Sequence, residues 1–147
     1  KTLALHRRIY GADATARCVI HTHSTHLVAL TLCGVWRNDD VLPPITPYFV
    51  MKVGHVPLVP YHRPGDPAVA ARVAGLTAEA QARQGRLRAV MLDRLGPNVW
   101  HETPAAAMAT LEELEETARL YLASGRSATP LPEAALEELR RTFGADW

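Results

Sequence analysis

The sequence has little of what marks several common protein classes. Only two of its 147 residues are cysteine, and Cys18 and Cys33 have no Cys-x-x-Cys spacing. A zinc knuckle or a redox pair is therefore not expected, and both are predicted to be buried free thiols. No apolar run approaches the roughly 18–20 residues needed to span a bilayer, and the start at Lys1 does not resemble a signal peptide. We expect a cytoplasmic protein.

The chain also lacks an excess of charge of either sign. Sixteen Lys and Arg oppose fifteen Asp and Glu, giving a net charge of +1, and 48% of the residues are hydrophobic. Such a balance provides no broad field to attract nucleic acid or an acidic membrane, so neither partner is expected. The length fits one domain. We predict a core over residues 1–126 and a linker with a C-terminal helix over residues 127–147.

Short strands are predicted to alternate with helices along the chain. Strands are expected in the compact apolar segments 16–23, 56–59, 88–92 and 98–101. Helices are expected from periodicity and capping residues at 3–10, 25–33, 48–53, 66–84, 103–122 and 132–143. This alternation predicts an α/β layered domain whose sheet is covered by helices.

The helix opened by Thr103 and Pro104 has the clearest periodicity of the chain. Its apolar residues are predicted to share one stripe, formed by Met108, Leu111, Leu114, Ala118 and Leu122. The glutamates of the same segment are expected to face water and to play no chemical role.

His21 and His23 form the sharpest local signal for chemistry. Residues two apart on a strand project to the same face, so these imidazoles can present two nitrogen ligands to one metal ion. A metal site needs a third ligand, and His26, one turn into the next helix, is one option. The alternative is that the two histidines end a strand and only form hydrogen bonds there.

Three blocks in order give the chain a family resemblance. They are CVIHTHSTHLVAL, ITPYFVMKVGHVPLVPYHRPGD and LGPNVWHETPAAAMATLEELEETARLYL. The sequence resembles the class II aldolase and adducin family, and within it the branch that decarboxylates 3-oxo-tetronate 4-phosphates, from Lys1 to about Gly125. The resemblance implies a three-layer α/β/α sandwich with a mainly antiparallel central sheet, lacking the family's N-terminal part. It also implies a homotetramer with active sites at subunit boundaries.

The resemblance further implies a carbon–carbon lyase, either a decarboxylase or an aldolase. Family members hold a divalent metal, commonly Zn²⁺, through the histidines that match His21 and His23 and a third in an Asn-His-Gly loop. The metal stabilises an enediolate formed from a phosphorylated sugar-acid substrate. Tyr48 matches a tyrosine that assists proton transfer in some members, although it could equally be a loop residue packed beneath the site. Lys1 lies beside the family's phosphate contacts and is a candidate substrate-binding residue.

Two positions depart from the family pattern. Arg94-Leu95-Gly96 stands where the family has Asn-His-Gly, so Leu95 replaces the third ligand. Thr2 stands where an acid/base glutamate is expected, and a threonine hydroxyl accepts no proton near neutral pH. His101 lies six residues beyond Leu95 and is a poor substitute ligand. These departures keep open a non-catalytic, adducin-like assembly module, beside the decarboxylase and a sugar-phosphate aldolase of the fuculose-phosphate type.

Overall fold

A four-stranded sheet forms the middle layer of the structure. The computed structural model describes residues 2–147, and Lys1 lies outside them. In spatial order the strands are β1 (Cys18–His21), β4 (Gly96–His101), β3 (Ala89–Leu92) and β2 (Leu58–Val59). The β1–β4 and β4–β3 pairs are antiparallel, and only the short β2 runs parallel to its neighbour β3. The sheet is therefore mainly antiparallel, as predicted.

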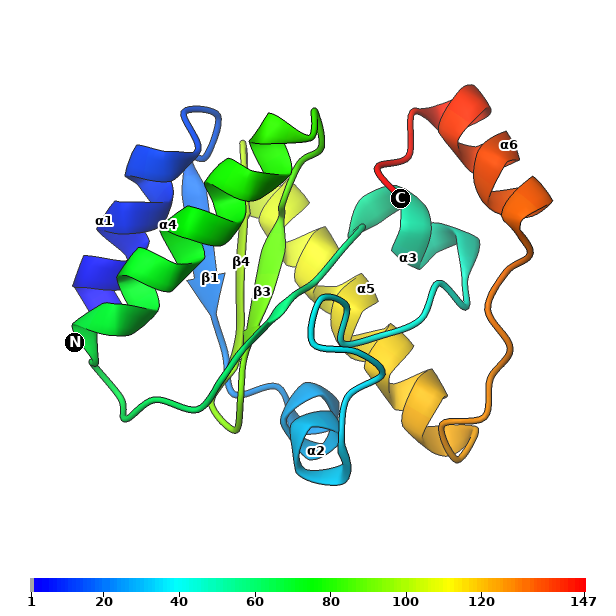
Figure 1. The fold of residues 1–147 in the computed structure, drawn as a ribbon, viewed down its shortest axis with the longest axis horizontal. Helices are drawn as coiled ribbons and strands as arrows, with labels where there is room; N and C mark the ends of the chain where they lie inside the picture. The colour runs from blue at the N-terminus through cyan, green and yellow to red at the C-terminus, as the bar shows by residue number, and fades with distance from the viewer. Residues whose placement is uncertain (1) are drawn as a thin grey trace.

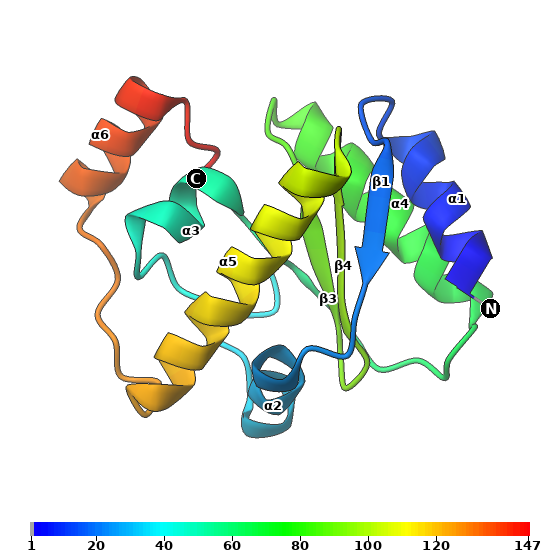
Figure 2. The same cartoon turned by 180° about the vertical axis from the view of Figure 1, so that it is seen from behind.

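Helices cover both faces of this sheet (Figure 1). One face carries α1 and α4, which pack against each other, and the other carries α5, on which α2 and α3 also pack (Figure 2). The last helix, α6, packs on α3. The helices are α1 (Thr2–Ala12), α2 (Thr25–Cys33), α3 (Pro47–Lys52), α4 (Pro67–Ala82), α5 (Pro104–Ala123) and α6 (Glu133–Phe143). The predicted α/β/α sandwich is confirmed.

Three helices start at a capping residue followed by proline, as the sequence predicted for two of them. In each, the cap side chain accepts a hydrogen bond from a backbone N–H of the first turn, and proline at the first helical position loses no bond. The pairs are Thr46–Pro47, Asp66–Pro67 and Thr103–Pro104. These local signals explain why the starts of α3, α4 and α5 are so well defined.

The core has one apolar cluster on each side of the sheet. Successive side chains of a strand point to opposite faces, so Val99 packs into the cluster under α5 with Leu114. Its neighbour Trp100 packs into the cluster under α1 and α4 with Ile9 and Val73. All five side chains are fully buried. The three layers are thus held together by burial on both faces of β4.

The buried stripe of α5 differs from the predicted one. Met108 is 45% exposed, and Leu122 is only partly buried against the core. The buried positions are Ala107, Thr110, Leu111, Leu114, Thr117, Ala118 and Tyr121. Two of them are threonines whose hydroxyls donate to carbonyls one turn earlier, at 3.0 Å and 2.8 Å. Because those hydroxyls are satisfied within the helix, they can be buried, and the stripe lies one position away from the one that hydrophobicity alone indicates.

The segment after α5 returns along the domain. The Arg126 guanidinium donates to the carbonyls of Cys33 and Gly34, and the Leu131 N–H donates to the Pro44 carbonyl at 2.8 Å. Both cysteines are free, as predicted, but Cys33 is exposed and Cys18 half-buried rather than buried. Within residues 2–147, no helix has both the length and the apolar character needed to cross a membrane. The division at residue 126 stays a prediction.

Candidate active site

His21 and His23 lie where β1 ends and the chain turns into α2. Only His21 belongs to the strand, where it pairs with Asn98 of β4, and His23 follows it in the connection to α2. Their ring centroids are 5.3 Å apart, with planes inclined by 73°. The predicted strand over residues 16–23 is therefore too long, yet the two imidazoles still lie side by side.

One hydrogen bond defines which nitrogen of His21 is open. Nδ1 lies 2.8 Å from the carbonyl oxygen of Pro97. A carbonyl only accepts, so Nδ1 carries a hydrogen, and Nε2 is the ring nitrogen left for another partner. A ring oriented by a backbone carbonyl in this way is the usual arrangement of a metal-binding histidine.

The turn between β3 and β4 lies directly against the two histidines. Gly96 has φ +118°, and a Cβ built on it would lie 1.9 Å from the carbonyl oxygen of Thr22. Only glycine permits this approach. The contact holds Arg94 and Leu95 beside His23, and all three residues line the same open hollow of about 420 Å³ together with Thr25, Val28, Ala29 and Leu32.

Leu95, which the resemblance places where a third ligand is expected, thus lies beside the hollow that His23 lines, and its side chain has no donor atom. Across residues 2–147, no group of three or more His, Cys, Asp or Glu side chains is arranged to hold a metal ion. The described residues therefore supply two imidazoles and do not complete a divalent-metal site by themselves. The metal role of His21 and His23 stays a prediction, and the role predicted for Lys1 falls on a residue outside the described part.

His26 is engaged elsewhere, and so is one glutamate of α5. Oε1 of Glu115 accepts from the backbone N–H of His26 and lies 2.8 Å from Nδ1 of its ring, while Oε2 accepts from the N–H of Leu27 at 3.1 Å. Ser24, the N-cap residue that precedes α2, makes no side-chain capping bond. Glu115 therefore caps α2 from another helix, and the expectation that all glutamates of α5 simply face water is wrong for this one.

A second polar group lies behind His21. Asn98 is fully buried, and neither its Oδ1 nor its Nδ2 has a hydrogen-bond partner among the described residues, nor does the buried Nε2 of His6. Burial lowers the pKa of His6 below 6.5, repulsion from His21 lowers it further, and a contact with Asn98 acts in the opposite direction. These surroundings favour the neutral form of the His6 imidazole. Sequence reasoning missed this cluster, and a lone asparagine inside an apolar strand was the one local feature that pointed to it.

Tyr48 does not line the hollow beside His23. It lies on α3 with 58% of its side chain exposed, and Nζ of Lys52 is 5.2 Å from its ring centroid. The alternative of a tyrosine packed beneath the site does not match this exposure. Its role in proton transfer stays a prediction.

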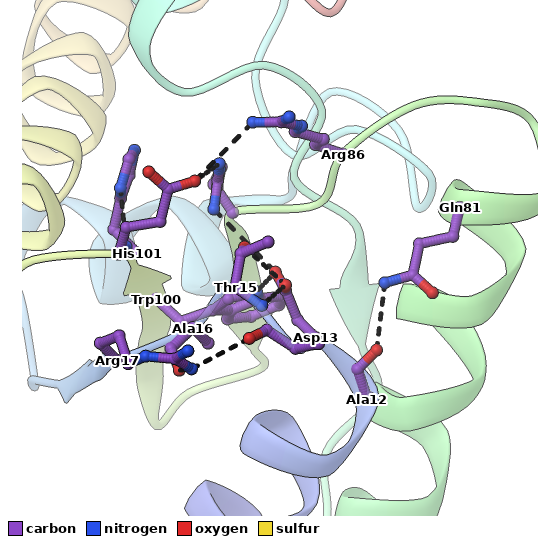
Figure 3. Close-up of polar contacts among 12 residues, drawn as sticks. Ala12, Asp13, Thr15, Ala16, Arg17, Gln81, Arg86, Trp100 and His101 are labelled. Atoms are coloured by element: carbon purple, nitrogen blue, oxygen red, sulfur yellow. Dashed lines mark hydrogen bonds and ion pairs between the residues drawn. The ribbon is translucent and has the colours of Figure 1, made fainter.

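His101 belongs to a different cluster, at the other end of β4 (Figure 3). It pairs with Cys18, the first residue of β1, whereas His21 is the last. Its neighbour Trp100 donates from Nε1 to Oδ2 of Asp13 at 3.1 Å. Burial lowers the pKa of His101 below 6.5, and the positive charge of Arg88 adds to the effect. His101 is therefore no substitute for the missing ligand, as the sequence predicted.

The Asp13 carboxylate ties the loop after α1 to this end of the sheet. Its Oδ1 accepts from the backbone N–H and the hydroxyl of Thr15, at 2.9 and 2.7 Å. Burial by itself raises the pKa of Asp13, but the bonds from Thr15 and Trp100, with the nearby Arg88, hold it below 3.8. These bonds hold the loop after α1 against β4, at the end of the sheet opposite His21.

Fold and site together define a class. Residues 1–122 match the family described as Class II Aldolase and Adducin N-terminal domain, and the chain belongs to this family. A 3-oxo-tetronate 4-phosphate decarboxylase of Cupriavidus necator is 58% identical to this chain. The alignment covers all of this chain and 67% of that protein. The structure of YgbL from Escherichia coli, described as a putative aldolase/epimerase/decarboxylase, superimposes with a TM-score of 0.83 at 38% identity, covering 95% of this chain and 64% of that one.

A more distant structure shows the fold alone. An L-fuculose 1-phosphate aldolase superimposes with a TM-score of 0.70 at 23% identity, covering 96% of this chain and 62% of that one. The predicted family is confirmed, and the predicted class of carbon–carbon lyase agrees with the names of these relatives. The chain spans about two thirds of the length of the relatives it matches.

Proposed function

We propose that this chain is the core of a cytoplasmic carbon–carbon lyase that decarboxylates a 3-oxo-tetronate 4-phosphate. The main support is the identity of 58% that extends over the whole chain to a decarboxylase of that name. The remaining elements of the proposal are a divalent metal, Zn²⁺ by preference, and a homotetramer. A tetramer is consistent with a site whose described residues are insufficient alone, because a neighbouring subunit can supply further groups.

The observation that carries the proposal is the arrangement of the two imidazoles. The Pro97 carbonyl fixes the tautomer of His21 so that Nε2 is open, and the His23 ring lies beside it. In this proposal both rings serve as metal ligands, and the other ligands come from outside the described residues. Lys1 contributes a charge for the substrate phosphate, and Tyr48 handles a proton in the reaction.

Metal content and turnover of the full-length natural protein test this proposal. Protein purified without chelator should carry stoichiometric metal and release CO₂ from a 3-oxo-tetronate 4-phosphate. His23→Ala should lower both metal content and turnover. His101→Ala is the matched control. His101, on β4, pairs with Cys18 at the end of β1 that is opposite to His21, so this substitution should leave the metal content unchanged. Unchanged metal in His23→Ala would remove the ligand role.

Leu95→His tests whether the turn still has the geometry of a ligand loop. Because Gly96 packs directly on the Thr22 carbonyl, an imidazole at position 95 should reach the space beside His23 and raise zinc affinity. Zinc titration with a competing chromophoric chelator measures the change, with Leu95→Gln as the control without an imidazole. Equal affinities for the two variants would show that position 95 does not reach the metal.

A non-catalytic, adducin-like assembly module is the second candidate function. It is favoured by Leu95 and Thr2, which stand where the family pattern has a metal-binding histidine and an acid/base glutamate. Metal-free full-length protein that forms tetramers without turnover would support this alternative over the decarboxylase. Cleavage of L-fuculose 1-phosphate, measured by its aldehyde product because no CO₂ is released, would instead indicate the aldolase chemistry named for the distant structural relative.

A further inference from the structure

The hollow beside His23 has one wall that carries a positive charge. Arg94 lines it from the β3–β4 turn, opposite the apolar side chains that α2 contributes. Arg94 is exposed, and within residues 2–147 its guanidinium forms no ion pair. Its own backbone N–H donates to the Thr31 hydroxyl at 3.1 Å, which anchors the turn to α2. The backbone is thus fixed while the charged group remains available.

Nearby acidic groups do not cancel this charge inside the hollow. The carboxylate of Glu115 is already bonded to two backbone N–H groups and the ring of His26. Asp93 precedes Arg94 in the turn but does not line the hollow. The lining residues therefore include Arg94, His23 and Thr25, and none of the lining residues is acidic.

We propose that this hollow binds an anionic oxygen group of the substrate, held by the guanidinium of Arg94. A guanidinium presents a planar fork of N–H donors that matches the oxygens of a carboxylate or a phosphate. Leu95 removes a cation ligand from this wall while Arg94 adds a cationic side chain, so the wall itself is suited to an anion. The inference rests on the proposed function only for the identity of the substrate.

Binding of 4-phosphoerythronate, which carries both a carboxylate and a phosphate, tests the inference by calorimetry in a chelating buffer. Arg94→Asn removes the charge without straining the turn, because Arg94 has φ +62° and asparagine tolerates that conformation better than most other non-glycine residues. We expect about a tenfold weaker Kd, or about 1.4 kcal/mol. Arg94→Lys should bind with intermediate affinity, since it keeps the charge but not the fork.

Arg72→Gln is the control, because Arg72 is an exposed arginine on α4, outside the hollow, and its loss should leave the Kd unchanged. Erythronate, which carries only the carboxylate, and inorganic phosphate are then titrated separately. The ligand whose binding weakens in Arg94→Asn identifies the group that Arg94 holds. Equal 4-phosphoerythronate affinity in wild type and Arg94→Asn would overturn the inference, as would no saturable binding to wild type. If Arg94-dependent binding occurs without decarboxylation, the inference stands and the proposed function fails.

Discussion

Replacing Gly96 by alanine should damage both the fold and the site. The new Cβ would lie 1.9 Å from the Thr22 carbonyl oxygen, and real Cβ atoms essentially never approach closer than 3.0 Å. The atom in the way is backbone, so it cannot be avoided by a change of rotamer. Because Thr22 lies between His21 and His23, relief of the clash must displace the segment that carries both imidazoles.

Two separate costs set the magnitude for Gly96→Ala. Holding an alanine at positive φ costs about 1–2 kcal/mol. Overpacking against a fixed neighbour typically costs about 1–3 kcal/mol more. The expected loss is therefore roughly 2–5 kcal/mol, a large part of the roughly 5–15 kcal/mol by which domains are stable.

Urea denaturation of three glycine variants separates these costs. Gly125 has φ +63°, and no atom lies within 4 Å of the place that a Cβ would take, so Gly125→Ala should show the conformational cost alone. Gly11 lies within α1, also with no atom within 4 Å, and Gly11→Ala should stabilise by about 0.5–1 kcal/mol. If Gly96→Ala loses no more stability than Gly125→Ala, the close contact with Thr22 does not exist in solution and the reasoning about the turn is refuted.

Two further predictions concern Glu115 and His6. In urea denaturation, Glu115→Gln should lower the free energy of unfolding by about 1 kcal/mol, because one amide oxygen cannot replace a carboxylate that caps two N–H groups. The control Glu112→Gln, at an exposed position of the same helix, should change this free energy by less than about 0.5 kcal/mol. The pKa of His6 is lowered from 6.5, so the unfolded chain binds a proton below that pH that the folded chain does not. The free energy of unfolding should therefore fall as pH drops below 6.5, and less steeply in His6→Gln; parallel pH profiles would contradict the assignment.

Local signals predicted most of the fold and part of the site. The caps at Asp66 and Thr103 and the short apolar strands depend only on neighbouring residues, so the order of elements could be predicted from the sequence. The stripe of α5 was displaced because buried threonines count as polar in a hydrophobicity pattern, although their hydroxyls are satisfied within the helix. A hydrophobic periodicity shows only which residues are apolar. A threonine can also be buried if its hydroxyl is hydrogen-bonded, as in this helix.

The parts of the site that sequence reasoning missed depend on contacts between distant segments. Glu115 and His26 are 89 residues apart, and no local pattern distinguishes this glutamate from the others in its run. Asn98 and His6 meet across the interface between β4 and α1, which only the three-dimensional packing creates. In contrast, His21 and His23 were found because their spacing along the chain already brings them together.

The position of the β3–β4 turn and the identity of the side chain it presents depend on different residues. The turn is held by the fit of Gly96 against Thr22 and by the bond from Arg94 N–H to Thr31, neither of which involves the side chain of Leu95. Residue 95 can therefore change without moving the turn away from His23. The same independence lets Arg94 project a charge into the hollow while its backbone remains anchored. The two imidazoles can thus stay beside this turn while the side chains that it presents vary, and substitutions at positions 94 and 95 should alter what binds there before they alter the fold.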